Sequence, residues 1–284
     1  MLVEKITSRQ NPLVKRFRRV RAGSERYHIF LEGVRLTAEA IAAGAHFESV
    51  AFTSELEASE RGLALLDALE NVPCRGAHVS KQVMEAIADT ESPQGVAAIV
   101  SRPFSELQDL FARDLQTIVI ADQLQDPGNL GTIIRTAEAA GADCLITTRY
   151  TVDPFNRKAL RASMGSALRL PLVTDAKLAD VVKLCRERGI KIVGTRPALA
   201  RPPGVIEDAA RKEAMRNYAD ADLAVPVALI LGREASGVSD ETAADADEFV
   251  RIPMAEGVES LNVSAAAAVL LYEMARQRGF ERQK

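Results

Sequence analysis

The sequence of 284 residues contains no tryptophan, only 5% aromatic residues and only three cysteines. Cys74, Cys144 and Cys185 are odd in number and far apart, so a disulfide framework is not expected and a reduced, cytoplasmic compartment fits best. There is no run of eighteen apolar residues, which excludes a membrane-spanning helix of ordinary length. Residues 1–16 lack the apolar segment of a secretory signal, so export is not expected.

Histidine is also scarce. His28, His46 and His78 are scattered, and neither they nor the cysteines have the spacing of metal ligands, so we expect no metal. Apolar residues make up 47% of the chain and charged residues 26%, which allows a sizeable core. The length indicates one large or two medium domains.

The formal net charge of −3 does not by itself suggest a nucleic-acid partner. However, residues 1–35 hold nine Lys or Arg against three Glu, which gives +6 there and −9 for the remainder. Because salt screens charges beyond about 10 Å, a local basic patch on an acidic protein can still bind phosphates. A solvated surface helix is the alternative interpretation.

Residues 1–102 alternate short apolar runs with helical stretches, which predicts a small α/β domain. Its expected strands are 28–31, 49–52 and 95–100, and its expected helices are 33–43, 61–69 and 79–88. Residues 103–114 are expected to form a linker.

Residues 115–284 show a second alternation of strands and helices. The expected strands are 117–122, 144–147, 171–173, 190–194, 227–231 and 248–252. Helices are expected between them, including 130–140, which Gly141 ends, and 263–278 after the last strand. Strict alternation predicts a mostly parallel sheet covered on both faces. The polar segment 197–221 is long for a connection, so we expect an excursion or flexible loop.

A first Gly- and Asn-rich segment, residues 126–135, follows a predicted strand. Gly128 and Gly131 are expected to let the chain turn tightly, Asn129 presents an amide, and Arg135 lies one helical turn beyond Gly131. The segment lacks the spacing of a dinucleotide fingerprint and the Gly-Lys-Ser/Thr of a P-loop. Alone, it is equally compatible with an ordinary strand–helix turn.

Two further segments follow later strands. Residues 229–237 place Glu234 in a loop between Gly232 and Gly237, although a β-turn with a solvated Glu would look the same. Residues 252–264 end a strand, cross a loop and open a helix, where Ser260 or Asn262 could be a simple N-cap. Ligands of parallel α/β sheets bind beyond the carboxyl ends of strands, so the shared placement of the three segments predicts a site.

Together the three segments resemble the signature motifs of the SpoU/TrmH family of RNA 2′-O-ribose methyltransferases, in the SPOUT superfamily. They read D-P-G-N-L-G-T-I-I-R-T-A-E-A-A-G-A-D, L-G-R-E-A-S-G-V-S-D-E and I-P-M-x5-S-L-N-V-S. Each motif is weak alone, but their order and spacing are specific. The resemblance covers roughly residues 115–280, and residues 1–102 resemble the ribosomal-protein-like RNA-binding domain of rRNA-directed members.

The resemblance implies a C-terminal trefoil-knotted, mostly parallel sheet preceded by the smaller α/β RNA-binding domain. It implies S-adenosyl-L-methionine as cofactor, RNA (rRNA first) as substrate, a homodimer, and neither metal nor membrane. The positions that match the family's catalytic residues are Asn129, Arg135, Glu234, Ser260 and Asn262. Those that match its cofactor-binding residues are Gly232, Ile252 and Leu261, with Thr195 as a fourth candidate. The candidate RNA-binding residues are Arg9, Lys15, Arg16, Arg18, Arg19 and Arg161.

The family's usual mechanism makes the first motif's arginine the proton acceptor. Because guanidinium holds its proton far above neutral pH, we expect Arg135 instead to grip a phosphate and stabilise the developing alkoxide, while Ser260 or a water relays the proton. Alternative functions are tRNA 2′-O-methylation, methylation of a base, and a non-catalytic RNA-binding or ribosome-assembly factor. A dinucleotide-dependent oxidoreductase is the least favoured, since the fingerprint spacing is missing.

Overall fold

The computed structural model of the protein describes residues 2–195, 215–233, 238, 244–258 and 260–280. The chain divides into two compact units, Met1–Pro103 and Phe104–Lys284, and each is described by itself. The expected domain limits of 1–102 and 115–284 remain a prediction, because compactness does not test where an independently folding domain begins.

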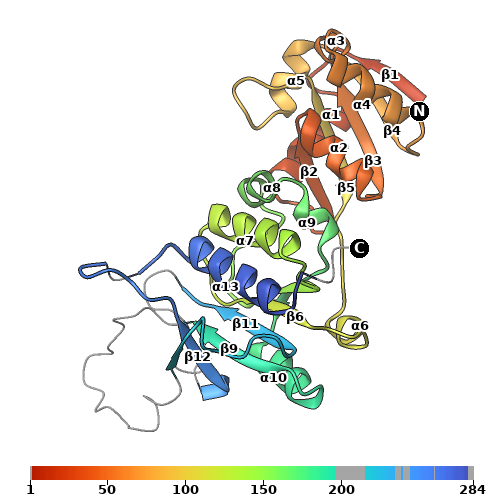
Figure 1. Ribbon diagram of the computed structural model, residues 1–284. Coiled ribbons are helices and arrows are strands. Elements are labelled where there is room, and N and C mark those ends of the chain that lie inside the picture. The colour runs from red at the N-terminus through yellow and green to blue at the C-terminus, as the bar shows by residue number, and fades with distance from the viewer. Residues whose placement is uncertain (1, 196–214, 234–237, 239–243, 259, 281–284) are drawn as a thin grey trace. The chain divides into compact units, whose positions relative to one another are not determined.

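The first unit is built on a mixed sheet with the strand order β1-β4-β3-β5-β2 (Figure 1). β1, β4 and β3 are parallel, whereas β5 runs antiparallel to both β3 and β2. The strands are β1 Leu2–Ile6, β2 His28–Glu32, β3 Phe47–Phe52, β4 Arg75–Val79 and β5 Val96–Ser101. The helices are α1 Pro12–Arg21, α2 Val34–Ala42, α3 Ser54–Glu57, α4 Glu60–Glu70 and α5 Lys81–Ile87.

Two helices, α1 and α5, cover one face of this sheet. Phe17 of α1 and Met84 of α5 are buried in one cluster with Phe30, Ala51 and Ile99 of the strands. α2 and α4 pack against each other, and α2 also contacts β2 and β5. Since no residue of α2 or α4 belongs to the cluster of α1 and α5, the second helix pair covers the opposite face.

The expected elements of this unit are present, but the sequence did not predict β1, β4 or α3. β4 reads Arg-Gly-Ala-His-Val, and of its buried residues Gly76, Ala77 and Val79 only the last is large and apolar, so the segment gives no clear apolar pattern. The basic N-terminal segment forms α1, which begins at an N-cap: Asn11 Oδ1 accepts a hydrogen bond of 2.8 Å from Leu13 N.

The second unit contains a seven-stranded sheet with the order β10-β12-β9-β11-β6-β7-β8. Every ladder between its described strands is parallel, as the sequence predicted. The strands are β6 Thr117–Ala121, β7 Cys144–Thr148, β8 Leu172–Ala176, β9 Lys191–Thr195, β10 Met215–Asn217, β11 Val227–Leu231 and β12 Glu248–Arg251. The helices are α6 Leu107–Phe111, α7 Pro127–Ala139, α8 Arg157–Ser163, α9 Ser166–Arg169, α10 Leu178–Glu187 and α13 Val263–Gln277.

Helices cover both faces of this sheet, which confirms the second part of that prediction. α6 and α10 pack on the side chains of Ile118, Ile120 and Ile146. α7 and α13 lie side by side on the other face (Figure 1). The side of α13 that the sequence predicted to be apolar is buried there, through Val263, Ala267, Leu270, Leu271 and Met274. Gly141 has φ +75° and follows α7 in the expected left-handed conformation.

Two segments differ from their expected form. The segment expected to be a linker contains α6, whose Leu110 and Phe111 are buried in the core of the second unit. Within the polar segment 197–221, residues 215–217 form β10, which extends the sheet beside β12. Residues 196–214 lie outside the described part of the chain.

Candidate active site

Four adjacent strands bring the predicted segments to one edge of the sheet. In the parallel register Leu231 lies beside Ala121, Ile230 beside Gly194, and Val250 beside Thr195. The loops after β6, β9, β11 and β12 therefore leave the same carboxyl edge. The four cofactor-binding candidates belong to this region: Thr195 ends β9, Gly232 follows β11, Ile252 follows β12, and Leu261 lies in the loop that leads from there to α13.

The first motif is mostly helix rather than loop. Asp126 is the N-cap of α7, and its Oδ1 accepts a hydrogen bond of 2.7 Å from Asn129 N. Pro127 is the first helical residue, where its missing N–H costs nothing. The expected tight turn at Gly128 and Gly131 is wrong, because both lie within α7 and neither has a positive φ.

Gly131 instead allows α7 to approach α8 closely. A Cβ atom at Gly131 would lie 2.4 Å from the carbonyl oxygen of Ala159 and 2.7 Å from the Cβ of Ala162. At the other end of α7, Arg169 binds both carboxylate oxygens of Glu138 at 2.7 and 2.9 Å, and this hydrogen bonding lowers the pKa of Glu138. The helix that carries Asn129 and Arg135 is thus fixed at its start, middle and end.

The first and third motifs meet through two asparagines. Asn262 Nδ2 donates a hydrogen bond of 3.0 Å to Asn129 Oδ1. Asn262 is also the N-cap of α13, because its Oδ1 accepts from Ser264 N at 2.9 Å. The amino ends of α7 and α13 are consequently held together. Asn262 is an N-cap, as the alternative interpretation proposed, but it also forms this hydrogen bond to the first motif.

The other catalytic candidates differ in what surrounds them. Arg135 is exposed on α7 and has no hydrogen-bond or ion-pair partner among the described residues. Ser260 and Leu261 are exposed immediately before α13, Leu261 to 39%. Thr195 Oγ1 donates to Ile230 O at 3.1 Å, which ties the end of β9 to β11. Glu234 and Gly237 lie outside the described residues.

A polar network that the sequence did not predict joins the loops after β6, β7 and β11. Gln123 N donates to Thr151 Oγ1 at 2.9 Å, and Thr151 Oγ1 donates to Ala121 O at 3.0 Å. Arg233 of the second motif donates to Gln123 Oε1. Gln123 has φ +58°, a conformation unusual for a residue other than glycine, and nothing in its residue type signals it.

In the first unit, the candidate RNA-binding residues of α1 fall into two groups. Lys15, Arg18 and Arg19 are exposed, on the side of α1 opposite to the buried Phe17. Arg16 is half-buried and forms ion pairs with Glu48 at 2.5 Å and Glu25 at 3.4 Å. The charge of Arg16 is therefore compensated within the protein.

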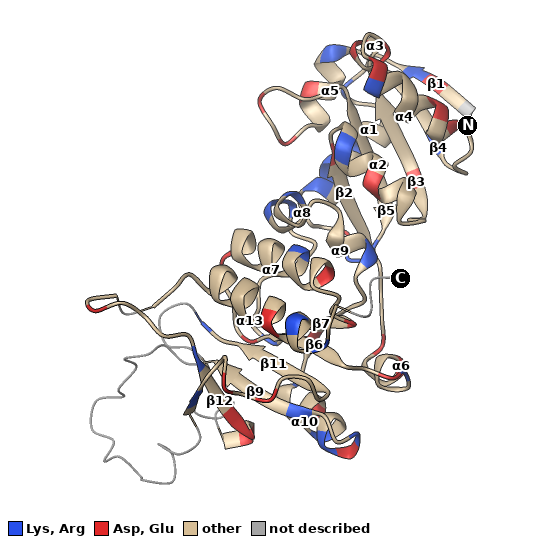
Figure 2. Cartoon of the chain, in the orientation of Figure 1, with Lys and Arg blue, Asp and Glu red and all other residues tan. Residues whose placement is uncertain are grey.

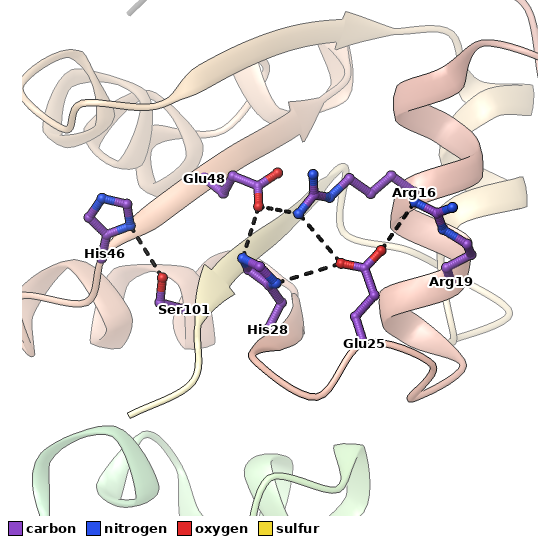
Figure 3. A network of polar contacts seen from close by, with 7 residues as sticks. All are labelled: Arg16, Arg19, Glu25, His28, His46, Glu48 and Ser101. Atoms are coloured by element: carbon purple, nitrogen blue, oxygen red, sulfur yellow. Dashed lines mark hydrogen bonds and ion pairs between the residues drawn. The ribbon is translucent and has the colours of Figure 1, made fainter. Parts of the chain in front are cut away.

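Arg16 belongs to a network that connects α1 with β2 and β3 (Figure 3). His28 on β2 lies between the same two carboxylates, 3.0 Å from Glu48 and 3.6 Å from Glu25, and Arg19 reaches Glu25 at 3.2 Å. Two neighbouring arginines bind backbone carbonyls instead. Arg9 donates to Gln82 O at 3.2 Å, and Arg21 donates to three carbonyls at the end of α5, among them Ile87 O at 3.0 Å.

Within the described residues, no helix is long and apolar enough to cross a membrane. The same part of the chain contains no cluster of three His, Cys, Asp or Glu side chains that could hold a metal ion. The parallel sheet, with its loops at one carboxyl edge, gives the second unit the features of the α/β proteins that bind ligands beyond the carboxyl ends of parallel strands.

Comparison with known families makes this class specific. Residues 116–272 match the SpoU rRNA Methylase family, and residues 3–98 match the MRM3-like substrate binding domain. The chain therefore belongs to the SpoU rRNA Methylase family. The trefoil knot implied by the family resemblance remains a prediction.

Several relatives are similar over nearly their whole length. The chain is 33% identical to an uncharacterized tRNA/rRNA methyltransferase of Synechocystis sp., over 97% of this chain and 95% of the relative. It is 30% identical to the 23S rRNA (guanosine(2553)-2′-O)-methyltransferase RlmP of Bacillus subtilis, over 96% and 99%. The crystal structure of an AdoMet-bound rRNA methyltransferase from Sinorhizobium meliloti superposes with a TM-score of 0.80 at 30% identity, over 96% of this chain and 98% of that one.

Proposed function

We propose that this protein transfers a methyl group from S-adenosyl-L-methionine to a ribose 2′-hydroxyl of ribosomal RNA. The observation that carries the proposal is the hydrogen bond from Asn262 to Asn129, which joins the first and third motifs at the sheet edge where the second motif also begins. Ribosomal RNA as substrate is supported by the relatives named for 23S rRNA and by the match to a substrate binding domain.

The cofactor-binding candidates have the chemistry that an adenosine requires. Ile252 is half-buried and Leu261 is 39% exposed, so both offer apolar surface that a flat ring can cover. Gly232 is buried directly after β11, where it contributes backbone groups and no side chain. When bound, S-adenosyl-L-methionine supplies an electrophilic methyl group on a sulfonium.

The residues of this chain would align the 2′-oxygen and manage its proton. Arg135 is exposed and has no partner among the described residues, so its guanidinium is available for a phosphate and for the developing alkoxide. Asn129, fixed by Asp126 and Asn262, would orient the nucleotide beside it. Ser260, exposed in the same loop as Leu261, or a water would relay the proton, and Glu234 would orient the second motif's loop.

Two further properties complete the proposal. We infer that the protein acts as a homodimer, because Tyr272 of α13 and Phe280 are 46% and 43% exposed and pack together with ring centroids 6.3 Å apart. Such exposed apolar surface is common at subunit interfaces. Cytoplasmic action follows from the proposed substrate and agrees with three free cysteines.

The test is the substitution Arg135→Ala, with Arg188→Ala, an exposed arginine just after α10, as the matched control. Labelled cofactor and ribosomal RNA are the substrates, and the product is digested to nucleosides to locate the methyl group. Arg135→Ala should lower kcat by about 100-fold or more, as loss of an oxyanion donor does, while the Kd of the cofactor stays unchanged. A large loss of cofactor affinity would refute the role.

The same assay, repeated with tRNA and accompanied by a measurement of RNA binding, separates the alternative functions. A methyl group found on the base would identify a base methyltransferase. Labelling of tRNA but not of ribosomal RNA would identify tRNA as the substrate. RNA binding without any transfer by the wild type would identify a non-catalytic factor.

A further inference from the structure

An exposed tyrosine lies beside the catalytic loops in a strained conformation. Tyr150, in the loop after β7, is 80% exposed and has φ +67°. A bulky side chain rarely adopts this left-handed conformation, because Cβ then crowds the backbone. Such strain persists only where the surrounding structure fixes it, and it is concentrated at functional sites.

Hydrogen bonds fix the backbone on both sides of Tyr150. Before it, Arg149 N donates to Ala176 O at 3.1 Å. After it, Val152 N donates to Leu124 O at 2.8 Å. Gln125 Nε2 donates to Tyr150 O itself at 2.6 Å. The aromatic ring therefore lies in solvent on a loop that hydrogen bonds hold in place. Because the ring is 80% exposed, packing in the core is not the reason for a large apolar side chain here.

This loop is connected to the catalytic segments. Gln125, which holds Tyr150, immediately precedes Asp126, the N-cap that binds Asn129 N. Gln125 Nε2 also donates to Gln123 O at 3.1 Å, and Gln123 accepts from Arg233 of the second motif. Tyr150 thus lies within one hydrogen-bond network with the first and second motifs.

The chain around Tyr150 is basic. Residues 149–161 contain Arg149, Arg157, Lys158 and Arg161 against the single acid Asp153, a net charge of +3 in a protein of net charge −3. In Figure 2 the blue segments of α8 mark Arg157, Lys158 and Arg161. Basic side chains around an exposed ring are the usual surface for single-stranded nucleic acid, because the cations meet phosphates while the ring stacks on a base.

We propose that Tyr150 stacks on an unpaired base of the substrate RNA next to the methylated nucleotide, and that the basic residues of 149–161 hold the adjoining phosphates. The proposal rests on the proposed function for the identity of the RNA. It assigns the second unit its own contact to RNA, separate from α1 of the first unit.

Three variants test the ring independently of the fold. Tyr150→Asn removes the ring but keeps a residue that tolerates a positive φ. Tyr150→Phe keeps the ring. Phe104→Ala removes a ring of similar exposure, 78%, that lies in the segment before α6. The Kd for 23S rRNA transcribed in vitro is measured in the presence of S-adenosylhomocysteine, together with the Kd of that cofactor product and the mass of the protein in solution.

We expect Tyr150→Asn to raise the Kd for RNA about tenfold, since stacking of one base contributes about that much or more. Tyr150→Phe and Phe104→Ala should bind RNA as the wild type does, and cofactor affinity should not change. An unchanged RNA affinity in Tyr150→Asn would overturn the proposal. So would an equal loss in Tyr150→Phe, a parallel loss of cofactor binding, or dissociation of an oligomer, because each would assign Tyr150 a structural or interface role.

The binding measurement does not depend on methyl transfer. If the wild type fails to methylate ribosomal RNA but the contrast between Tyr150→Asn and Tyr150→Phe persists, the proposed reaction fails and the stacking role stands. If the wild type methylates and the two variants bind equally, only the stacking role fails.

Discussion

Asn262 Nδ2 and Asn129 Oδ1 lie 3.0 Å apart, and this hydrogen bond joins the N-cap of α13 to the first turn of α7. The two residues are separated by 133 positions in the sequence. Because α7 and α13 pack on the same face of the sheet, the bond fixes where their amino ends stand relative to each other. Both ends of the Asn262 amide are engaged, so its two roles can be separated by substitution.

Asn262→Asp should retain the N-cap and remove the donor to Asn129. We expect little change in stability and a fall in kcat of about tenfold or more, since misplacement of a positioning residue by about 1 Å is costly. Ser59→Asp is the control, because it adds the same charge at another N-cap, that of α4, where Ser59 Oγ lies 3.0 Å from Gly62 N. Steady-state kinetics and thermal unfolding of both variants check the expectation, and equal kcat values would contradict it.

Gly131→Ala should destabilise the second unit. The new Cβ would meet the carbonyl oxygen of Ala159 at 2.4 Å, and backbone cannot move aside as a flexible side chain can. Overpacking of this kind costs about 1–3 kcal/mol, which outweighs the roughly 1 kcal/mol gain in helix propensity. Thr132→Ala, at an exposed position of the same helix, is the control and should lie within about 0.5 kcal/mol of the wild type. Urea unfolding measures both, and similar midpoints would show that α7 and α8 can separate freely.

The position of the candidate site at one edge of the sheet could be predicted from the sequence, because parallel strands place every following loop there. The loops after β6, β11 and β12 do leave the same edge and are joined by hydrogen bonds. Which contacts form there could not be predicted, because the bond between Asn129 and Asn262 depends on how two helices pack. Nor could the positive φ of Gln123 and Tyr150 be detected, since neither residue type marks a turn. The prediction of a tight turn at the glycines of the first motif was wrong, because glycine also occurs where two helices pack closely, as Gly131 does here.

The basic face of α1 gives a prediction about salt. Lys15 and Arg18 are exposed, and neither has a partner among the described residues. Lys15→Gln with Arg18→Gln should weaken binding to 23S rRNA and reduce the slope of log K against log salt by about 1 for each lost phosphate contact. Arg61→Gln with Lys81→Gln removes the same charge from exposed positions on α4 and α5 and is the control. If both pairs change the slope equally, only net charge matters.

Cys144 and Cys185 predict how stability depends on pH. Both thiols are buried in the same core cluster, and burial raises the pKa of each from 9.0 to about 12. Between these values the unfolded chain releases the thiol protons and the folded chain keeps them, so raising the pH favours unfolding. The stabilisation is complete below pH 9 and should fall by roughly 1 kcal/mol per thiol by pH 10.

The test is urea unfolding at pH 7 and at pH 10, measured for the wild type and for the double variant Cys144→Ala with Cys185→Ala. The difference between the two proteins isolates the contribution of the two thiols, because all other titrating groups are shared. Cys74→Ala, at a partly buried position, controls for loss of a thiol as such. The double variant should lose less stability than the wild type over this interval, and an identical loss in the two proteins would mean that neither thiol resists ionisation in the folded state.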